Sequence, residues 1–310
     1  MPKRLVFPQD AVDLVAKLES ESSRDDADED TPSSHTDDNV SAVFFELANT
    51  DEIVFEYSNN NDTKPKSLVF QQDRSACGKH TGGIIWETAY VLLQYLLEQP
   101  PPAATTATLL GDVVELGAGV GFLGQCLAAA GCARSMLLTD TAEVIPHTKT
   151  TLEENQQQLS LVTIHDDHDK VPITVCALDW VHCERDIQVS LSRNNKDSSF
   201  DTIVSTDVLF APQLVEPLLD TASRLWKNET TVWYLCVQIR CAKSHQLFLD
   251  RCPHYGFHLD DWSSRLNVMG RSMECCLFRI TRRRNSDTTT TRPSSGGSQN
   301  NKKKQKTTPA

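Results

Sequence analysis

Long apolar runs are missing from this chain of 310 residues. No stretch approaches the roughly 18–20 unbroken apolar residues that a membrane-spanning helix needs. Only three apolar residues separate Arg4 from Pro8, and the apolar core of a signal peptide needs more than that. The sequence therefore predicts neither a membrane protein nor a secreted one, and we expect it in the cytoplasm.

Paired cysteines are missing as well. The chain has ten cysteines, but no two of them stand in the Cys-x-x-Cys spacing that is typical of zinc sites and redox motifs. Their scatter indicates reduced, buried thiols and not a disulfide framework. The stretch 165–169 (HDDHD) has metal-ligand residue types, but its place between a helix and a strand favours a solvated acidic loop, so we predict no metal site.

Basic residues are scarce in the body of the chain. Residues 42–280 carry 30 acidic and 18 basic side chains, whereas residues 1–41 have a net charge of −7 and residues 281–310 one of +7. An acidic body disfavours direct nucleic-acid binding, which needs surfaces rich in lysine and arginine. It favours a cationic partner.

Composition divides the chain into three segments. Residues 1–41 are acidic and serine-rich, and we expect them to be largely disordered. Residues 42–281 have the composition of a globular domain, and residues 282–310 form a basic tail that is also disordered by composition. The run Lys302–Lys306 fits either a solvated tail or a nuclear-import patch, so we add the nucleus to the expected location. No internal repeat is visible, and we expect a monomer.

Between the tails, strand patterns alternate with helix patterns. Continuous apolar runs separated by amphipathic helices predict an α/β fold, with a doubly wound, mostly parallel seven-stranded Rossmann-like sheet and an antiparallel edge strand. A small β extension precedes it, with a hairpin of 43–47 and 53–57 and a short strand at 67–70. The predicted strands of the main sheet are 109–116, 135–140, 173–178, 200–206, 231–239, 257–262 and 273–281, and the predicted helices are 83–98, 121–130, 142–157, 212–226 and 244–255.

A glycine-rich turn lies between a strand and a helix at 113–122 (VVELGAGVGF). Ligands of doubly wound sheets bind at such carboxyl-end crevices, although a plain strand–helix turn is the simpler alternative. The third glycine comes one residue too early for the dinucleotide fingerprint, and Glu115 would repel a pyrophosphate. The carboxylate instead suits a cationic or hydroxyl-bearing ligand.

The next strand ends in Thr139-Asp140, about 20 residues past the glycines. A nucleoside ribose would present its two hydroxyls to a carboxylate at this point. Asp140 could instead cap the following helix. Together with the glycine turn, the ribose interpretation is favoured.

These two motifs resemble those of seven-strand methyltransferases that use S-adenosylmethionine. Three further stretches, 81–89 (TGGIIWETA), 177–180 (ALDW) and 200–210 (FDTIVSTDVLF), resemble the family-16 enzymes, the METTL21-like protein-lysine methyltransferases. The resemblance covers about residues 42–281 and implies S-adenosylmethionine as cofactor. It implies that Trp86 and Glu115 lie near the methionine end of the cofactor, Gly117, Ala118 and Gly119 beneath it, Asp140 at the ribose, Asp179 and Trp180 at the adenine, and Thr206 and Asp207 at the far end of the pocket.

The acceptor side departs from the family pattern at one position. The family's fourth-strand motif ends in tyrosine, and here Phe210 keeps the ring but lacks the hydroxyl. Asp207 and Phe210 are the candidate catalytic residues, with Asp207 orienting an incoming lysine ammonium. Simpler interpretations are a helix cap for Asp207 and core aromatics for Trp86 and Trp180.

The predicted function is transfer of a methyl group to a protein side chain, most simply a lysine amine. Three alternatives stay open: arginine, histidine or a small molecule as acceptor of the same cofactor's methyl group, a non-catalytic cofactor-binding module, and a dinucleotide oxidoreductase. Arg240 follows the fifth predicted strand, where the family commonly has a basic residue, and receives no role from the sequence.

Overall fold

The computed structural model describes residues 3–7, 47, 49–57, 66–75, 81–98, 110–159, 171–191 and 199–282. The acidic stretch before residue 42, apart from the strand at 3–7, lies outside these residues, as do the loop 165–169 and the basic tail. The boundaries of the three predicted segments therefore stay a prediction. Within the described part, no helix is both long and apolar enough to cross a membrane.

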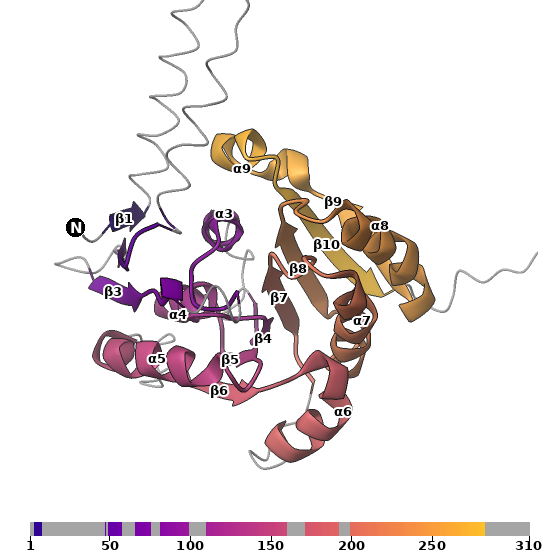
Figure 1. The fold of residues 1–310 in the computed structure, drawn as a ribbon, viewed down its shortest axis with the longest axis horizontal. Coiled ribbons are helices and arrows are strands. Elements are labelled where there is room, and N and C mark those ends of the chain that lie inside the picture. Colours follow the sequence, from indigo (N-terminus) through magenta and orange to yellow (C-terminus); the bar gives the residue numbers. More distant parts are fainter. Residues whose placement is uncertain are drawn as a thin grey trace, which may run out of the picture.

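A seven-stranded sheet forms the centre of the molecule (Figure 1). Its strand order is β6-β5-β4-β7-β8-β10-β9, and the pairs from β6 to β8 are all parallel. The predicted α/β class and seven-stranded sheet are thus confirmed. The strands are β4 (Asp112–Leu116), β5 (Ser135–Asp140), β6 (Ile173–Ala177), β7 (Thr202–Thr206), β8 (Val232–Val237), β9 (Phe257–Asp261) and β10 (Cys276–Arg282).

Antiparallel pairing is confined to one side of the sheet. β10 inserts between β8 and β9 and runs antiparallel to both, so the edge strand β9 has an antiparallel neighbour. Residues 262–275, which include a 3-10 turn and a short helix, link β9 to β10. The reversed strand is therefore not the edge strand itself but the one next to it.

Helices cover both faces of the sheet (Figure 1), as strands that are buried on both faces require. Along β4, Val113 belongs to the core beneath α3 and α4, whereas Val114 and Leu116 belong to the core beneath α7 and α8. The helices are α3 (Glu87–Leu97), α4 (Phe122–Ala129), α5 (Ile145–Leu159), α6 (Cys183–Asp186), α7 (Val215–Arg224), α8 (Ala242–Arg251) and α9 (Val268–Ser272).

A second sheet of three strands, β1 (Lys3–Phe7), β2 (Glu52–Tyr57) and β3 (Lys66–Gln71), packs against the helices of the first. β2 pairs antiparallel with β3 and parallel with β1. The sequence analysis did not predict strand β1. The predicted hairpin partner 43–47 is wrong at Leu47, which is helical, and its other residues lie outside the described part.

Aromatic packing explains where this small sheet sits. The rings of Phe55 and Phe70 lie 6.0 Å and 5.0 Å from that of Phe122 at the start of α4. Asn155 of α5 accepts from the backbone N–H of Val69 at 2.8 Å and donates to its carbonyl at 2.9 Å. The extension is thereby fixed to the two helices that follow the glycine turn and the Asp140 strand.

Several helix boundaries differ from the sequence prediction. The helix expected from residue 83 begins at Glu87, because residues 81–86 are irregular and line the cavity described below. A 3-10 turn, α6 and a π-helical turn over Ile187–Leu191 follow β6 and were not predicted. Trp180, Cys183 and Ile187 stand at helical spacing and pack in or against the core beneath α7 and α8, so this signal was overlooked.

Charged side chains join the amino ends of three neighbouring strands, opposite the glycine turn. Arg134 Nη2 lies 2.6 Å from Asp112 Oδ2 and 2.7 Å from Asp201 Oδ2, and Lys227 Nζ lies 2.8 Å from Asp201 Oδ1. Burial raises the pKa of the Asp201 carboxyl, but hydrogen bonds from the Asp112 amide and Lys227 outweigh it and hold this pKa below its ordinary range.

Asp201→Asn is expected to lower the free energy of unfolding by about 1–2 kcal/mol at pH 7, because a hydrogen-bonded, partly buried charge is lost. Since the folded-state pKa is depressed, the carboxylate stabilises the fold above its unfolded pKa. That contribution is lost as pH falls through the folded value. Urea unfolding at pH 7 and pH 3 checks this: a difference between variant and wild type that does not shrink at pH 3 contradicts the assigned network.

Candidate functional site

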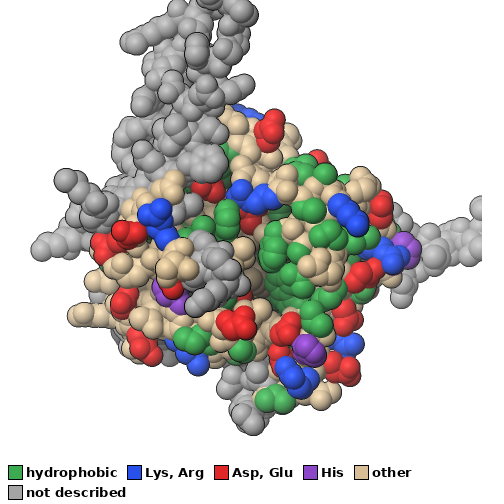
Figure 2. Space-filling model, in the orientation of Figure 1, with side chains coloured by type: hydrophobic (Ala, Val, Ile, Leu, Met, Phe, Trp, Pro, Cys, Tyr) green, Lys and Arg blue, Asp and Glu red, His purple; other side chains and the backbone are tan. Residues whose placement is uncertain are grey.

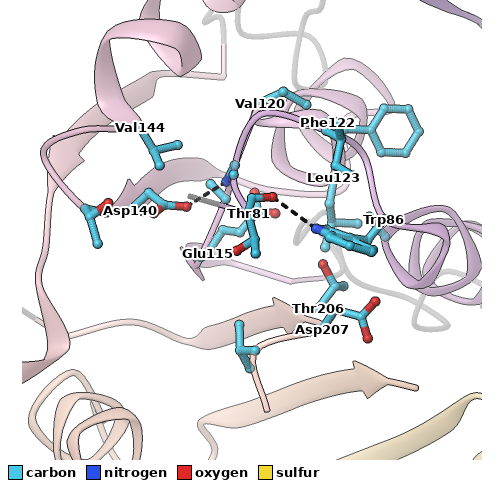
Figure 3. Close-up of a pocket in the computed structure, with 18 of the residues that line it drawn as sticks. Thr81, Trp86, Glu115, Val120, Phe122, Leu123, Asp140, Val144, Thr206 and Asp207 are labelled. Atoms are coloured by element: carbon cyan, nitrogen blue, oxygen red, sulfur yellow. Dashed lines mark hydrogen bonds between the residues drawn. The ribbon is translucent and has the colours of Figure 1, made fainter. Parts of the chain in front are cut away.

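A cavity of about 350 Å³ opens at the carboxyl ends of β4, β5 and β7. Its size falls within the range of small-molecule sites, and its place is where doubly wound sheets bind ligands. Figure 3 shows Asp140 on one side of it and Thr206 and Asp207 on the other. Every residue that the sequence analysis assigned to the site lines it: Trp86, Glu115, Gly117, Ala118, Gly119, Asp140, Asp179, Trp180, Thr206, Asp207 and Phe210.

The glycine turn forms the floor of the cavity. Gly117 and Gly119 have φ values of 76° and 54°, which L side chains rarely adopt. A Cβ on Gly119 would stand 3.1 Å from the carbonyl oxygen of Gly82, and one on Gly117 would stand 3.0 Å from Val208. Both glycines therefore keep backbone and ligand space open where a side chain would fill it.

Asp140 is held at the end of β5 by backbone amides. Its Oδ2 accepts from the N–H of Gly119 at 2.9 Å (Figure 3), and its Oδ1 accepts from the N–H of Thr141 at 2.7 Å. Each carboxylate oxygen can accept more than one hydrogen bond. The side chain is thus fixed in direction and retains acceptor capacity toward the cavity, which suits a pair of ligand hydroxyls.

Glu115 lies beneath the turn and is almost completely buried, with 2% of its surface exposed. Its Oε2 accepts from the amide of Gly124 at 3.0 Å, which ties β4 to α4. Burial raises the pKa of the Glu115 carboxyl to about 8, the Gly124 hydrogen bond lowers it, and the nearby Asp140 raises it. Near neutral pH this group is therefore mostly uncharged, a state that the sequence did not predict.

Asp179 and Trp180 follow β6 and form the wall beside the glycine turn. Asp179 Oδ1 accepts from the amide of Val181 at 2.9 Å, and its Oδ2 lies 2.7 Å from His182 Nδ1. The Trp180 ring passes 3.5 Å from the Cβ position of Gly117, and its indole N–H is buried without a hydrogen-bond partner among the described residues. An unpartnered buried donor at a cavity wall favours a ligand that can accept from it.

Trp86 forms the opposite wall, just before α3 begins. Its indole N–H donates to the carbonyl oxygen of Thr81 at 3.1 Å (Figure 3). This hydrogen bond closes residues 81–86 into a loop over the cavity. Ile84 and Ile85 of this loop line the cavity. Trp86 is therefore a wall residue with a satisfied polar atom.

Asp207 follows β7 with a left-handed φ of 51°, which is uncommon for a residue other than glycine. Its side chain is only 3% exposed. Oδ1 accepts from the amide of Gln238 at 2.9 Å, and Oδ2 accepts from Arg240 Nη2 at 2.8 Å. A strained backbone held by such contacts occurs most often at functional sites. Phe210, by contrast, is 41% exposed at the mouth of the cavity.

Sequence reasoning missed several residues of this site. Gly82 packs against Val144, and both line the cavity, although only the stretch around Gly82 carried a visible motif. Arg240 reaches Asp207 across the strand ends, and nothing in its local sequence indicates that contact. Among the described residues, no group of His, Cys, Asp or Glu side chains is arranged to hold a metal ion.

Comparison with known proteins agrees with the geometry. The mouse protein-lysine methyltransferase METTL21E is 29% identical over 185 residues, which cover 59% of this chain and 66% of that protein. Human FAM86B1, provisionally named a protein N-methyltransferase, is 23% identical over 215 residues, which cover 65% of this chain and 59% of that protein. This chain thus spans about three fifths of the length of the first curated relatives it matches.

A solved structure and a protein-family model were also compared with this chain. The solved ribosomal protein L11 methylase from Lactobacillus delbrueckii subsp. bulgaricus is 16% identical with a TM-score of 0.37, covering 64% of this chain and 78% of that one. The model of the lysine methyltransferase family matches residues 62–253, more than half of the sequence. That stretch contains the glycine turn, Asp140, Trp180, Asp207 and Arg240, and the chain therefore belongs to the lysine methyltransferase family.

Proposed function

We propose that this chain transfers a methyl group from S-adenosylmethionine to a lysine amine of a protein substrate. The observation that carries the proposal is the cavity at the strand ends, where the glycine turn and Asp140 form one side and Asp207 the other. One side offers acceptors for a nucleoside, and the other offers the polar side chain of Asp207 to an amine. A two-sided site of this kind suits a reaction between a nucleoside cofactor and an amine.

The lining residues fit S-adenosylmethionine chemically. Asp140 has acceptor capacity for ribose hydroxyls, and the open backbone at Gly117 and Gly119 lets a ligand lie against it. The indole N–H of Trp180 finds no acceptor in the described part of the chain, so a ring nitrogen or ribose oxygen of the cofactor could accept from it. When bound, the cofactor supplies a methyl group activated by a sulfonium.

The chain's own residues supply orientation and a dry site. Trp86, Ile84 and Ile85 exclude water on one wall, and Val208 does so on another. The exposed ring of Phe210 offers an apolar surface to the aliphatic stem of a lysine side chain. Asp207 provides the polar contact for the amine at the inner end.

A protein with a basic surface is the proposed partner. The body of the chain carries the whole net charge of −12, because the charges of the two tails cancel. Figure 2 shows acidic side chains at the border of an apolar area on the visible face. The curated relatives named as protein methyltransferases support a protein acceptor, and METTL21E supports lysine.

Labelled methyl transfer in a matching cell lysate, followed by mass spectrometry of the labelled protein, is expected to show methyl-lysine. Calorimetric titration with S-adenosylmethionine is expected to show binding. The same titration with NAD is expected to show none. Methyl-arginine or methyl-histidine as the sole product would replace the proposed acceptor. Absence of S-adenosylmethionine binding would end the proposal altogether.

A further inference from the structure

Arg240 joins the end of β7 to the start of α3 beside the acceptor end of the cavity. Its Nε and Nη2 lie 3.1 Å and 2.8 Å from Asp207 Oδ2. The same Nη2 lies 3.6 Å from Glu87 Oε2 at the first residue of α3. The carbon of the guanidinium lies 4.5 Å from the ring centroid of Trp86. One side chain thus contacts the end of β7, the start of α3 and the aromatic wall.

Arg240 makes these contacts from outside the cavity. Asp207 and Trp86 line the cavity, whereas Arg240 lines an adjoining hollow together with Gln238, Ile239, Met273 and Glu274. Its side chain is 34% exposed, so it has room to be replaced without disturbing a packed core. Its effect on an acceptor in the cavity must therefore act through Asp207 and Trp86.

The contact changes the charge that the cavity presents. The carboxylate of Asp207 is 3% exposed, and both of its oxygens are already hydrogen-bonded, one by the Gln238 amide and one by Arg240. A guanidinium at this distance offsets much of the charge that the Asp207 carboxylate presents to a third group. Glu87 shares the same guanidinium and Glu274 lines the hollow beside it, but neither of them lines the cavity.

We propose that Arg240 is a positioning residue that keeps Asp207 in a neutral pair, so that the acceptor amine meets a polar but uncharged wall. The inference rests on the proposed function. A bare carboxylate would favour the ammonium form of the acceptor, and that form has no lone pair for attack. The paired Asp207 carboxylate can still accept a hydrogen bond from the free amine, because each carboxylate oxygen accepts more than one. Stacking on Trp86 holds the guanidinium in place.

Binding of n-butylamine, a mimic of the lysine side chain, tests this without cofactor or turnover. The binding is followed on the tryptophan indole N–H signals by NMR, with Trp86 assigned through Trp86→Phe. Arg240→Met is expected to bind n-butylamine at least about tenfold more tightly than wild type, since one close charge pair becomes available to the amine. Binding of the uncharged n-butanol is expected to stay the same, and Arg240→Lys is expected to restore wild-type behaviour.

Two controls separate charge from structure. Arg224→Met removes the same charge from an exposed pair with Asp220 on α7 and is expected to bind n-butylamine as wild type does. Arg240→Gln can still hydrogen-bond Asp207 and replaces Arg240→Met if urea unfolding shows that variant to be unfolded. Equal n-butylamine binding by wild type and the uncharged variant, including none by either, overturns the inference, as does an equal gain for n-butanol. Failure of methyl transfer in the lysate would instead count against the proposed function.

Discussion

Replacing Asp140 with alanine is expected to weaken S-adenosylmethionine binding about 5- to 150-fold, the loss of about 1–3 kcal/mol from charged hydrogen bonds. Two physical losses add together. The ribose hydroxyls lose their acceptors, and the amide of Gly119 loses the carboxylate that fixes the turn. Isothermal titration of the variant against wild type measures the change directly.

Two companion variants sharpen the Asp140 test. Asp140→Asn keeps one oxygen acceptor and is expected to lie between alanine and wild type. Asp250→Ala, on an exposed part of α8, controls for the change in net charge. Because the alanine variant also loosens the turn, its unfolding without cofactor is measured in parallel. Unchanged affinity in a fully folded Asp140→Ala protein would contradict the assigned ribose site.

Glu115→Gln is expected to change how stability depends on pH. In the folded chain, burial raises the pKa of the Glu115 carboxyl to about 8, whereas an unfolded glutamate has a pKa of about 4.3. Between these values the folded state binds the extra proton. The stability that this group contributes is therefore complete below the unfolded pKa. It is lost as pH rises toward the folded pKa, at up to about 1.4 kcal/mol per pH unit.

Glutamine removes that titration while its amide oxygen can still accept from Gly124. The free energy of unfolding of Glu115→Gln, relative to wild type, is expected to rise steadily from pH 5 to pH 8. Urea unfolding across that range measures it, with Glu184→Gln, 69% exposed, as the matched surface control. A flat difference for Glu115→Gln would show that Glu115 ionises in the fold as it does in water.

The parallel sheet and the cavity at its strand ends could be predicted because both depend on signals that are local in the sequence. Apolar runs mark the strands, and Ser135–Asp140 is confirmed to the residue. The glycine turn and Asp140 stand at strand ends, and parallel strands bring their carboxyl ends together. The lining of one cavity by all the predicted site residues follows from that rule, although their individual roles stay predictions.

Other features depend on contacts between distant segments and left no local signal. The pairing of β1 with β2 brings residue 3 beside residue 53, and no periodicity could indicate that. The hydrogen bond from Arg240 to Asp207 joins residues 33 positions apart in the sequence, and it depends on how the ends of β7 and β8 lie side by side. The raised pKa of Glu115 likewise follows from the depth of burial that α4 imposes. These are consequences of packing and not of sequence pattern.

The positive φ values of Gly117 and Gly119 limit which cavity positions can accept an amino-acid substitution. Most L side chains would strain either position by about 1–2 kcal/mol before any collision with Gly82 or Val208 is counted. The cofactor half of the cavity is therefore closed to substitution at its floor. The opposite half ends in Phe210, which is exposed at the mouth of the cavity. Substitutions that change the acceptor can therefore arise only in the second half of the cavity. Homologues that methylate a different substrate should differ from this chain in sequence there first.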